Sequence, residues 1–128
     1  MSSAAVLHVC VTCRAGRELA EGEPRPGRLL HDAVLRARLV QPDDGLQVRE
    51  VMCLAACDRG CSAALTAPGK WSYLLGRLSP DHAADLLTYG ALYAAHETGK
   101  IMQSLRPASL RDVVLGRTPA LPVPEPGA

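Results

Sequence analysis

Apolar and polar positions follow two different periods along this chain, which predict strands in some stretches and helices in others. Residues 6–11 form a mostly apolar run rich in β-branched side chains, which is typical of a buried strand. Between residues 28 and 40 the apolar positions recur at helical spacing, and Pro42 marks the end of that helix. We expect strands over residues 6–11, 46–51, 62–66 and 71–78, and helices over residues 28–40, 79–96 and 109–115.

The order of these elements predicts how the strands pair. A right-handed crossover through the first helix makes the first two strands parallel neighbours. The strands at 62–66 and 71–78 are joined by a short Pro-Gly turn and form an antiparallel hairpin. The sequence therefore predicts an α/β domain with a four-stranded mixed sheet covered by the two long helices. This is the order of a thioredoxin-like fold with an extra C-terminal segment.

Composition and charge exclude several classes of protein. The 128 residues suit a single domain, which we assign to residues 1–117, followed by a flexible Pro-rich tail at 118–128. The net charge is only +1, so no basic excess points to nucleic acid. No apolar run approaches the ~18 residues of a membrane span, and the N-terminus lacks the features of a secretory signal. We therefore expect a cytoplasmic protein that binds neither nucleic acid nor membrane.

The five cysteines carry the strongest chemical signal. An odd number of thiols in a reducing compartment favours metal binding or redox chemistry over a disulfide framework. Cys10 and Cys13 follow the first predicted strand, while Cys53 and Cys57 follow the second. Parallel neighbouring strands end at the same edge of a sheet, so these four thiolates can converge there, as an iron–sulfur cluster or a zinc site requires. Cys61 is the spare thiol, although it could replace Cys13 or Cys57 as a ligand.

The second cysteine loop resembles that of known iron–sulfur proteins. Residues 51–58, Val-Met-Cys-Leu-Ala-Ala-Cys-Asp, are similar to the second ligand loop of thioredoxin-like two-iron ferredoxins. The thioredoxin-like subunit of respiratory NADH dehydrogenases has a similar loop. The resemblance spans roughly residues 6–95. It implies a [2Fe–2S] cluster whose ligands are Cys10, Cys13, Cys53 and Cys57.

A narrower resemblance covers almost the whole chain. Residues 57–61, 68–71 and 106–107 are similar to an uncharacterised bacterial family described as predicted metal-binding. Its members are often associated with cobalamin-biosynthesis genes. The resemblance therefore implies a redox partner in a cobalamin or other tetrapyrrole pathway.

Residues next to the cysteines suit the negative charge of such a centre. Four thiolates around a two-iron, two-sulfide core carry a net negative charge. Arg14 and Arg59 each stand beside a cysteine loop, and Gly16 and Gly60 permit backbone N–H groups to approach sulfur closely. We expect Arg14, Arg59 and Gly60 to stabilise the centre and tune its potential.

We therefore expect a small one-electron carrier rather than an enzyme, with a redox partner protein docking beside the cysteines. A homodimer is left open. Two alternatives use the same thiols. The first is a Cys-ligated zinc or other soft-metal binding module. The second is a thiol–disulfide oxidoreductase at Cys10 and Cys13. In such enzymes a helix N-terminus beside the cysteine pair lowers the pKa of the nucleophilic thiol, whereas the helix predicted here starts well after Cys13.

Overall fold

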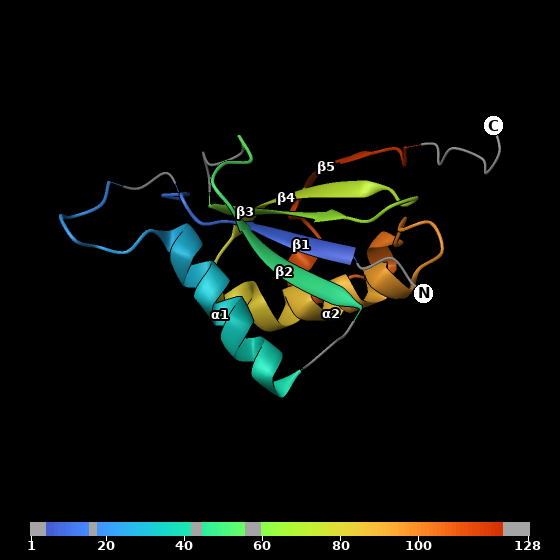
Figure 1. The fold of residues 1–128 in the computed structure, drawn as a ribbon, viewed down its shortest axis with the longest axis horizontal. Coiled ribbons are helices and arrows are strands. Elements are labelled where there is room, and N and C mark those ends of the chain that lie inside the picture. Colours follow the sequence, from blue (N-terminus) through green and yellow to red (C-terminus); the bar gives the residue numbers. More distant parts are fainter. Residues whose placement is uncertain (1–4, 16–17, 42–44, 56–59, 122–128) are drawn as a thin grey trace.

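The computed structural model describes residues 5–15, 18–41, 45–55 and 60–121. These residues form a five-stranded sheet and two α-helices, α1 (Pro26–Val40) and α2 (Ala83–Ala95) (Figure 1). The strands are β1 (Ala5–Cys10), β2 (Leu46–Val51), β3 (Cys61–Thr66), β4 (Ser72–Leu78) and β5 (Val114–Thr118). Short 3-10 turns lie at Pro80–His82, Gln103–Leu105 and Ala108–Leu110.

The strands lie in the order β2-β1-β3-β4-β5. β1 and β2 are parallel, with Cys10 opposite Val51, and β3 and β4 form the antiparallel hairpin. Both pairings confirm the prediction from element order. Because β1 and β2 run in the same direction, both strands finish at the same end of the sheet.

The two helices cover one face of the sheet, below it in Figure 1, and the core lies between helices and sheet. In β1, alternate residues turn toward the helices, and Leu7 and Val9 are fully buried there. The helices contribute apolar side chains from one stripe each. The buried residues of the helices that join this core are Leu30, Val34, Ala83, Leu86, Leu87, Tyr89 and Tyr93.

The C-terminal segment corrects one prediction. The helix expected over residues 109–115 is absent, because the helical turn closes at Leu110 and the chain then extends as β5 along the edge of β4. Ser109, the first residue of the expected helix, donates a hydrogen bond to Asp85 Oδ2 at 2.5 Å. The sheet thus has five strands instead of four. A flexible tail was predicted for residues 118–128. Its first residue, Thr118, is the last residue of β5, and residues 122–128 lie outside the described residues.

Within the described ranges, neither helix has the length and apolar character needed to cross a lipid bilayer.

Candidate metal centre

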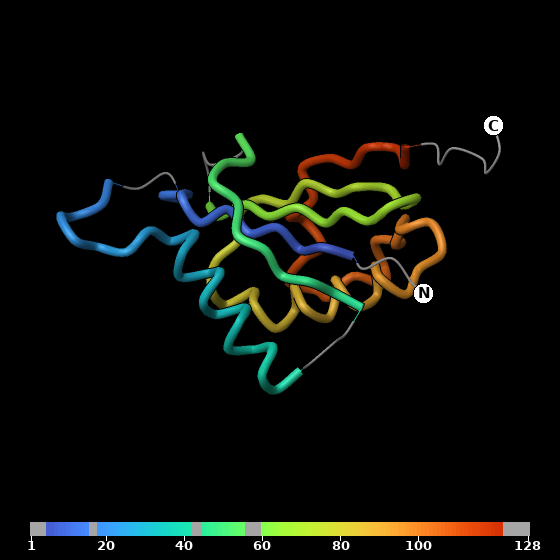
Figure 2. The backbone as a smooth tube through the Cα atoms, in the orientation of Figure 1, coloured from blue at the N-terminus to red at the C-terminus, as the bar shows by residue number. Residues whose placement is uncertain are grey.

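The cysteine-bearing segments gather at one end of the sheet, at the left in Figure 2. Cys10 is the last residue of β1, Cys53 follows β2, and Cys61 is the first residue of β3. Since β3 runs antiparallel to β1, its start lies at the end where β1 finishes. The parallel crossover and the antiparallel return together bring these three positions to the same end of the molecule.

Direct contacts join the first cysteine pair to the second cysteine-bearing segment. Cys10 Sγ lies 3.8 Å from the carbonyl oxygen of Met52, the residue before Cys53. The Cys13 thiol donates to the carbonyl oxygen of Gly60, the residue before Cys61, over 3.0 Å. Two loops that are far apart in sequence therefore meet through their sulfur atoms and backbone carbonyls.

The sulfurs of the four described cysteines do not surround a common point. Among residues 5–15, 18–41, 45–55 and 60–121, no three Cys, His, Asp or Glu side chains form a group able to hold a metal ion. Cys57 and Arg59, both predicted for the site, lie outside the described residues. A thiolate at Cys13 has no proton to donate to Gly60, so ligation through Cys13 requires that carbonyl to turn away.

Both cysteine loops contain the same local hydrogen bond. The backbone N–H of Ala15 donates to Cys13 Sγ, and that of Ala55 donates to Cys53 Sγ, each over 3.3 Å. Ala15 and Ala55 each have a φ of 56°, a left-handed conformation that is costly for alanine. N–H groups pointed at sulfur favour the negatively charged thiolate over the thiol. The two loops are thus shaped alike to support thiolate ligands.

These donors are other backbone groups than the predicted ones. Gly60 was expected to let a backbone N–H approach sulfur, and in the structure its carbonyl oxygen accepts a hydrogen bond from Cys13. Its φ of 128° and its close packing on the backbone of Arg77 explain why glycine is needed there. The actual donors, Ala15 and Ala55, have one signal in the sequence, because each stands two residues after a cysteine. Their positive φ values could not be read from the residue type.

The N-terminus of α1 packs directly on the first cysteine pair, which sequence reasoning did not anticipate. The N–H of Gly27 donates to the carbonyl oxygen of Cys13 over 3.1 Å, and Arg25 Nη1 donates to Thr12 O over 2.7 Å. A Cβ at Gly27 would lie 2.0 Å from the carbonyl oxygen of Cys10 and 3.1 Å from Cys13 Cβ. The partial positive charge of a helix N-terminus favours negative charge nearby. The N-terminus of α1 is therefore placed to favour negative charge on the first cysteine pair, although α1 starts well after that pair in the sequence.

The sulfurs differ in their access to solvent. Cys10 and Cys13 are buried, whereas Cys53 is exposed and stands next to Met52, whose side chain is 76% exposed. Arg14 is exposed on the first loop. Cys61 is also buried, but it belongs to the core cluster that packs under the helices.

An ion pair limits the negative charge near the cysteines. Arg28 Nη1 lies 2.8 Å from Glu50 Oε2, beside the end of β2. The hydrogen bond and the charge of Arg28 hold the pKa of the Glu50 carboxyl below its usual range. The carboxylate is therefore ionised but paired, and it adds little repulsion to thiolates nearby.

Comparisons with known proteins agree with this architecture. A family model described as "Protein of unknown function (DUF1636)" matches residues 7–120. The solved structure of a thioredoxin-like [2Fe–2S] ferredoxin from Aquifex aeolicus matches with a TM-score of 0.54 at 15% sequence identity, over 91% of this chain and 94% of that one. No curated protein matches. The structural match confirms the thioredoxin-like fold predicted from the order of elements.

Proposed function

The chain belongs to the DUF1636 family of proteins of unknown function, and we propose that it is a small electron-transfer protein carrying a [2Fe–2S] cluster. The observation that carries the proposal is the matched pair of loops, in which Cys13 and Cys53 each accept an N–H from a left-handed alanine. The likeness in fold to a structure described as a thioredoxin-like [2Fe–2S] ferredoxin supports it.

The proposed ligands are Cys10, Cys13, Cys53 and Cys57, and the bound cluster would supply one-electron redox chemistry. Other groups of the protein stabilise the charged ligands. The N–H groups of Ala15 and Ala55 and the N-terminus of α1 offset the negative charge of the thiolates. Burial of Cys10 and Cys13 keeps water away from one side of the site.

Exposure of Cys53 and Met52 supports a docking position for a partner at the second loop. Electron transfer between proteins requires close approach to an accessible part of the site, and Cys53 is the exposed cysteine of the four that the structure describes. We place the redox partner protein against Cys53 and Met52. A partner from a cobalamin or other tetrapyrrole pathway, and a cytoplasmic location, stay predictions from the sequence.

Metal analysis of the protein purified without oxygen tests the proposal. We expect a red-brown protein with about two iron and about two sulfide per chain, because four thiolates complete such a cluster. Visible absorption and chemical analysis of one sample give both readouts. A colourless protein that holds zinc alone, even after reconstitution with iron and sulfide, would contradict the proposal.

Two observations bear on the alternatives. N–H groups directed at thiolates suit zinc as well as iron, so a zinc module is the second candidate and the same metal analysis separates it. The α1 N-terminus against Cys10 and Cys13 favours thiol–disulfide exchange. Both of those sulfurs are buried, however, and an exchanging thiol must reach an external disulfide. We therefore rank exchange chemistry last.

We expect Cys61→Ser to retain the cluster spectrum and to lose modest stability. Cys61 pairs with Leu78 in the β3–β4 ladder and packs in the apolar core, so its replacement buries a hydroxyl at a cost of about 1–3 kcal/mol. Absorption spectra and thermal unfolding measure the two effects. Loss of the cluster in Cys61→Ser, with retention in Cys13→Ser, would show that Cys61 is the ligand in place of Cys13.

A further inference from the structure

Two positive side chains meet on the single tryptophan of the chain, at the end of the sheet away from the cysteines. Lys100 Nζ lies 5.0 Å from the centre of the Trp71 ring, and the guanidinium carbon of Arg117 lies 5.1 Å from it. The three residues come from separate segments, before β4, after α2 and within β5. We call this cluster of Trp71, Lys100 and Arg117 the Trp71 corner.

Backbone contacts hold the Trp71 corner in place. The N–H of Trp71 donates to Thr98 O over 2.9 Å, and the hydroxyl of the buried Tyr93 donates to Trp71 O over 2.5 Å. Gly99, with a φ of 79°, lets the segment after α2 approach this strand, since a Cβ there would meet Tyr93 and Lys70. The backbone of Trp71 is therefore held in place before any ligand arrives, which lowers the entropy cost of binding.

Among the described residues, no carboxylate forms an ion pair with either cation of the corner. The ion pairs found among the described residues involve neither Lys100 nor Arg117, and both side chains are exposed. Lys70, the other lysine of the chain, differs, because its Nζ donates to the carbonyl oxygens of Tyr93 and Ala94. Two like charges over one ring repel each other, and an added anion would relieve that repulsion.

The position of β5 indicates the shape of the ligand. β5 is the last strand of the sheet, and in the described part of the chain β4 is its one neighbour. A Cβ added at Gly116, beside Arg117, would meet no atom of the described residues within 4 Å. An exposed strand at the edge of a sheet can pair with an extended peptide, and a peptide with several carboxylates can contact both cations at once. A single aromatic ring and a net charge of +1 make nucleic acid a poor fit.

We propose that the Trp71 corner and the adjoining edge of β5 bind an extended acidic segment of a partner protein. The site is separate from the cysteines, because the two lie at opposite ends of β3. Tyr73, at the start of β4 beside Trp71, pairs with Leu65 near the end of β3, whereas Cys61 is the first residue of β3. A partner held here leaves the cysteine end accessible. The proposal does not depend on the identity of the metal.

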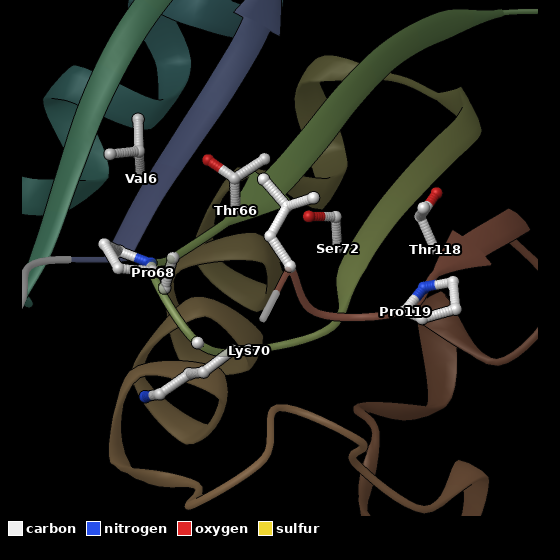
Figure 3. A pocket seen from close by; sticks show the side chains of 10 residues that line it. Val6, Thr66, Pro68, Lys70, Ser72, Thr118 and Pro119 are labelled. Atoms are coloured by element: carbon white, nitrogen blue, oxygen red, sulfur yellow. The ribbon is translucent and has the colours of Figure 1, made fainter. Parts of the chain in front are cut away.

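A nearby groove is the strongest competing place for such a ligand. It has a volume of about 590 Å³, and the residues that line it include Val6, Thr66, Pro68, Lys70, Ser72, Thr118 and Pro119, which Figure 3 labels. Ser72 and Thr118 follow Trp71 and Arg117 in the chain, so they point to the opposite face of the same end of the sheet. The groove is mainly apolar, and in Figure 3 the Lys70 side chain points away from the other labelled residues. It therefore attracts carboxylates less than the Trp71 corner.

Fluorescence of Trp71 tests the proposal directly, because no other tryptophan contributes to the emission. The probe is a blocked hexaglutamate peptide, titrated at low salt into the full chain as purified. We expect a saturable change in emission whose midpoint concentration rises severalfold when the ionic strength is raised to about 0.15 M. Hexalysine should produce no such change.

Charge-removing variants give the specificity of the test. Lys100→Gln and Arg117→Gln should each weaken binding of hexaglutamate up to about fivefold, and the double variant more, since each exposed ion pair contributes modestly. Arg36→Gln, which removes one exposed charge from α1, is the matched control and should bind like the original chain. All three positions are exposed, so thermal unfolding should stay unchanged.

Three results would overturn the proposal. Emission that does not respond to hexaglutamate shows that no acidic segment binds. An equal loss of affinity in Arg36→Gln shows that net charge, and not the Trp71 corner, is responsible. Inorganic phosphate that reproduces the whole response at the same concentration shows a site for small anions instead of a protein segment.

Discussion

Cys13→Ser and Cys53→Ser should each abolish the visible absorption of the [2Fe–2S] cluster or shift it strongly. A serine hydroxyl is a much poorer ligand for iron than a thiolate, and it also ends the N–H···S contact with Ala15 or Ala55. We expect iron content to fall well below that of the original chain in protein purified and reconstituted in parallel. The measurement is absorption together with iron and sulfide per chain.

Cys61→Ser is the matched control for these two variants, because it makes the same chemical change in a buried cysteine of the core. Thermal unfolding of the metal-free proteins separates a lost ligand from a lost fold. Full cluster occupancy in Cys53→Ser would remove the exposed cysteine from the ligand set. It would also leave the docking position proposed for the redox partner without support.

Gly27→Ala is expected to disrupt the first cysteine loop, although alanine favours helices. In an exposed helix the change would stabilise the protein by about 0.5–1 kcal/mol. At Gly27 the new methyl group would lie 2.0 Å from the carbonyl oxygen of Cys10, so helix or loop must move. Overpacking of this kind costs about 1–3 kcal/mol or more, and the clash therefore outweighs the gain in propensity.

Three measurements check the Gly27→Ala prediction. The unfolding temperature should fall, a thiol reagent should label Cys10 and Cys13 faster, and the cluster should load less completely. Gly116→Ala is the control, because nothing lies within 4 Å of the position that its Cβ would take. Unchanged stability and unchanged thiol labelling in Gly27→Ala would show that α1 does not hold the cysteine loop.

Local patterns predicted the elements whose residues are buried on one face. The apolar, β-branched run at residues 6–11 and the helical spacing of apolar residues at 28–40 are properties of short stretches, and the structure has a strand and a helix there. β5 was missed because Gly116, Arg117 and Thr118 are exposed and show no apolar alternation. An edge strand of this kind is stabilised by hydrogen bonds to β4, a partner that is distant in sequence.

By itself, the sequence determined that cysteines follow two parallel strands and therefore lie at one end of a thioredoxin-like sheet. That conclusion needs only chain order and the handedness of the crossover, which do not depend on side-chain detail. The tertiary structure alone decided which groups surround the sulfurs. Ala15 and Ala55 adopt left-handed backbone angles that their residue type does not predict. Gly27 packs on Cys10, and Lys100 and Arg117 meet on Trp71, so these contacts join segments that are separate in the sequence. Such contacts depend on how the helices and the sheet pack together, so they cannot be predicted from any short stretch of the sequence.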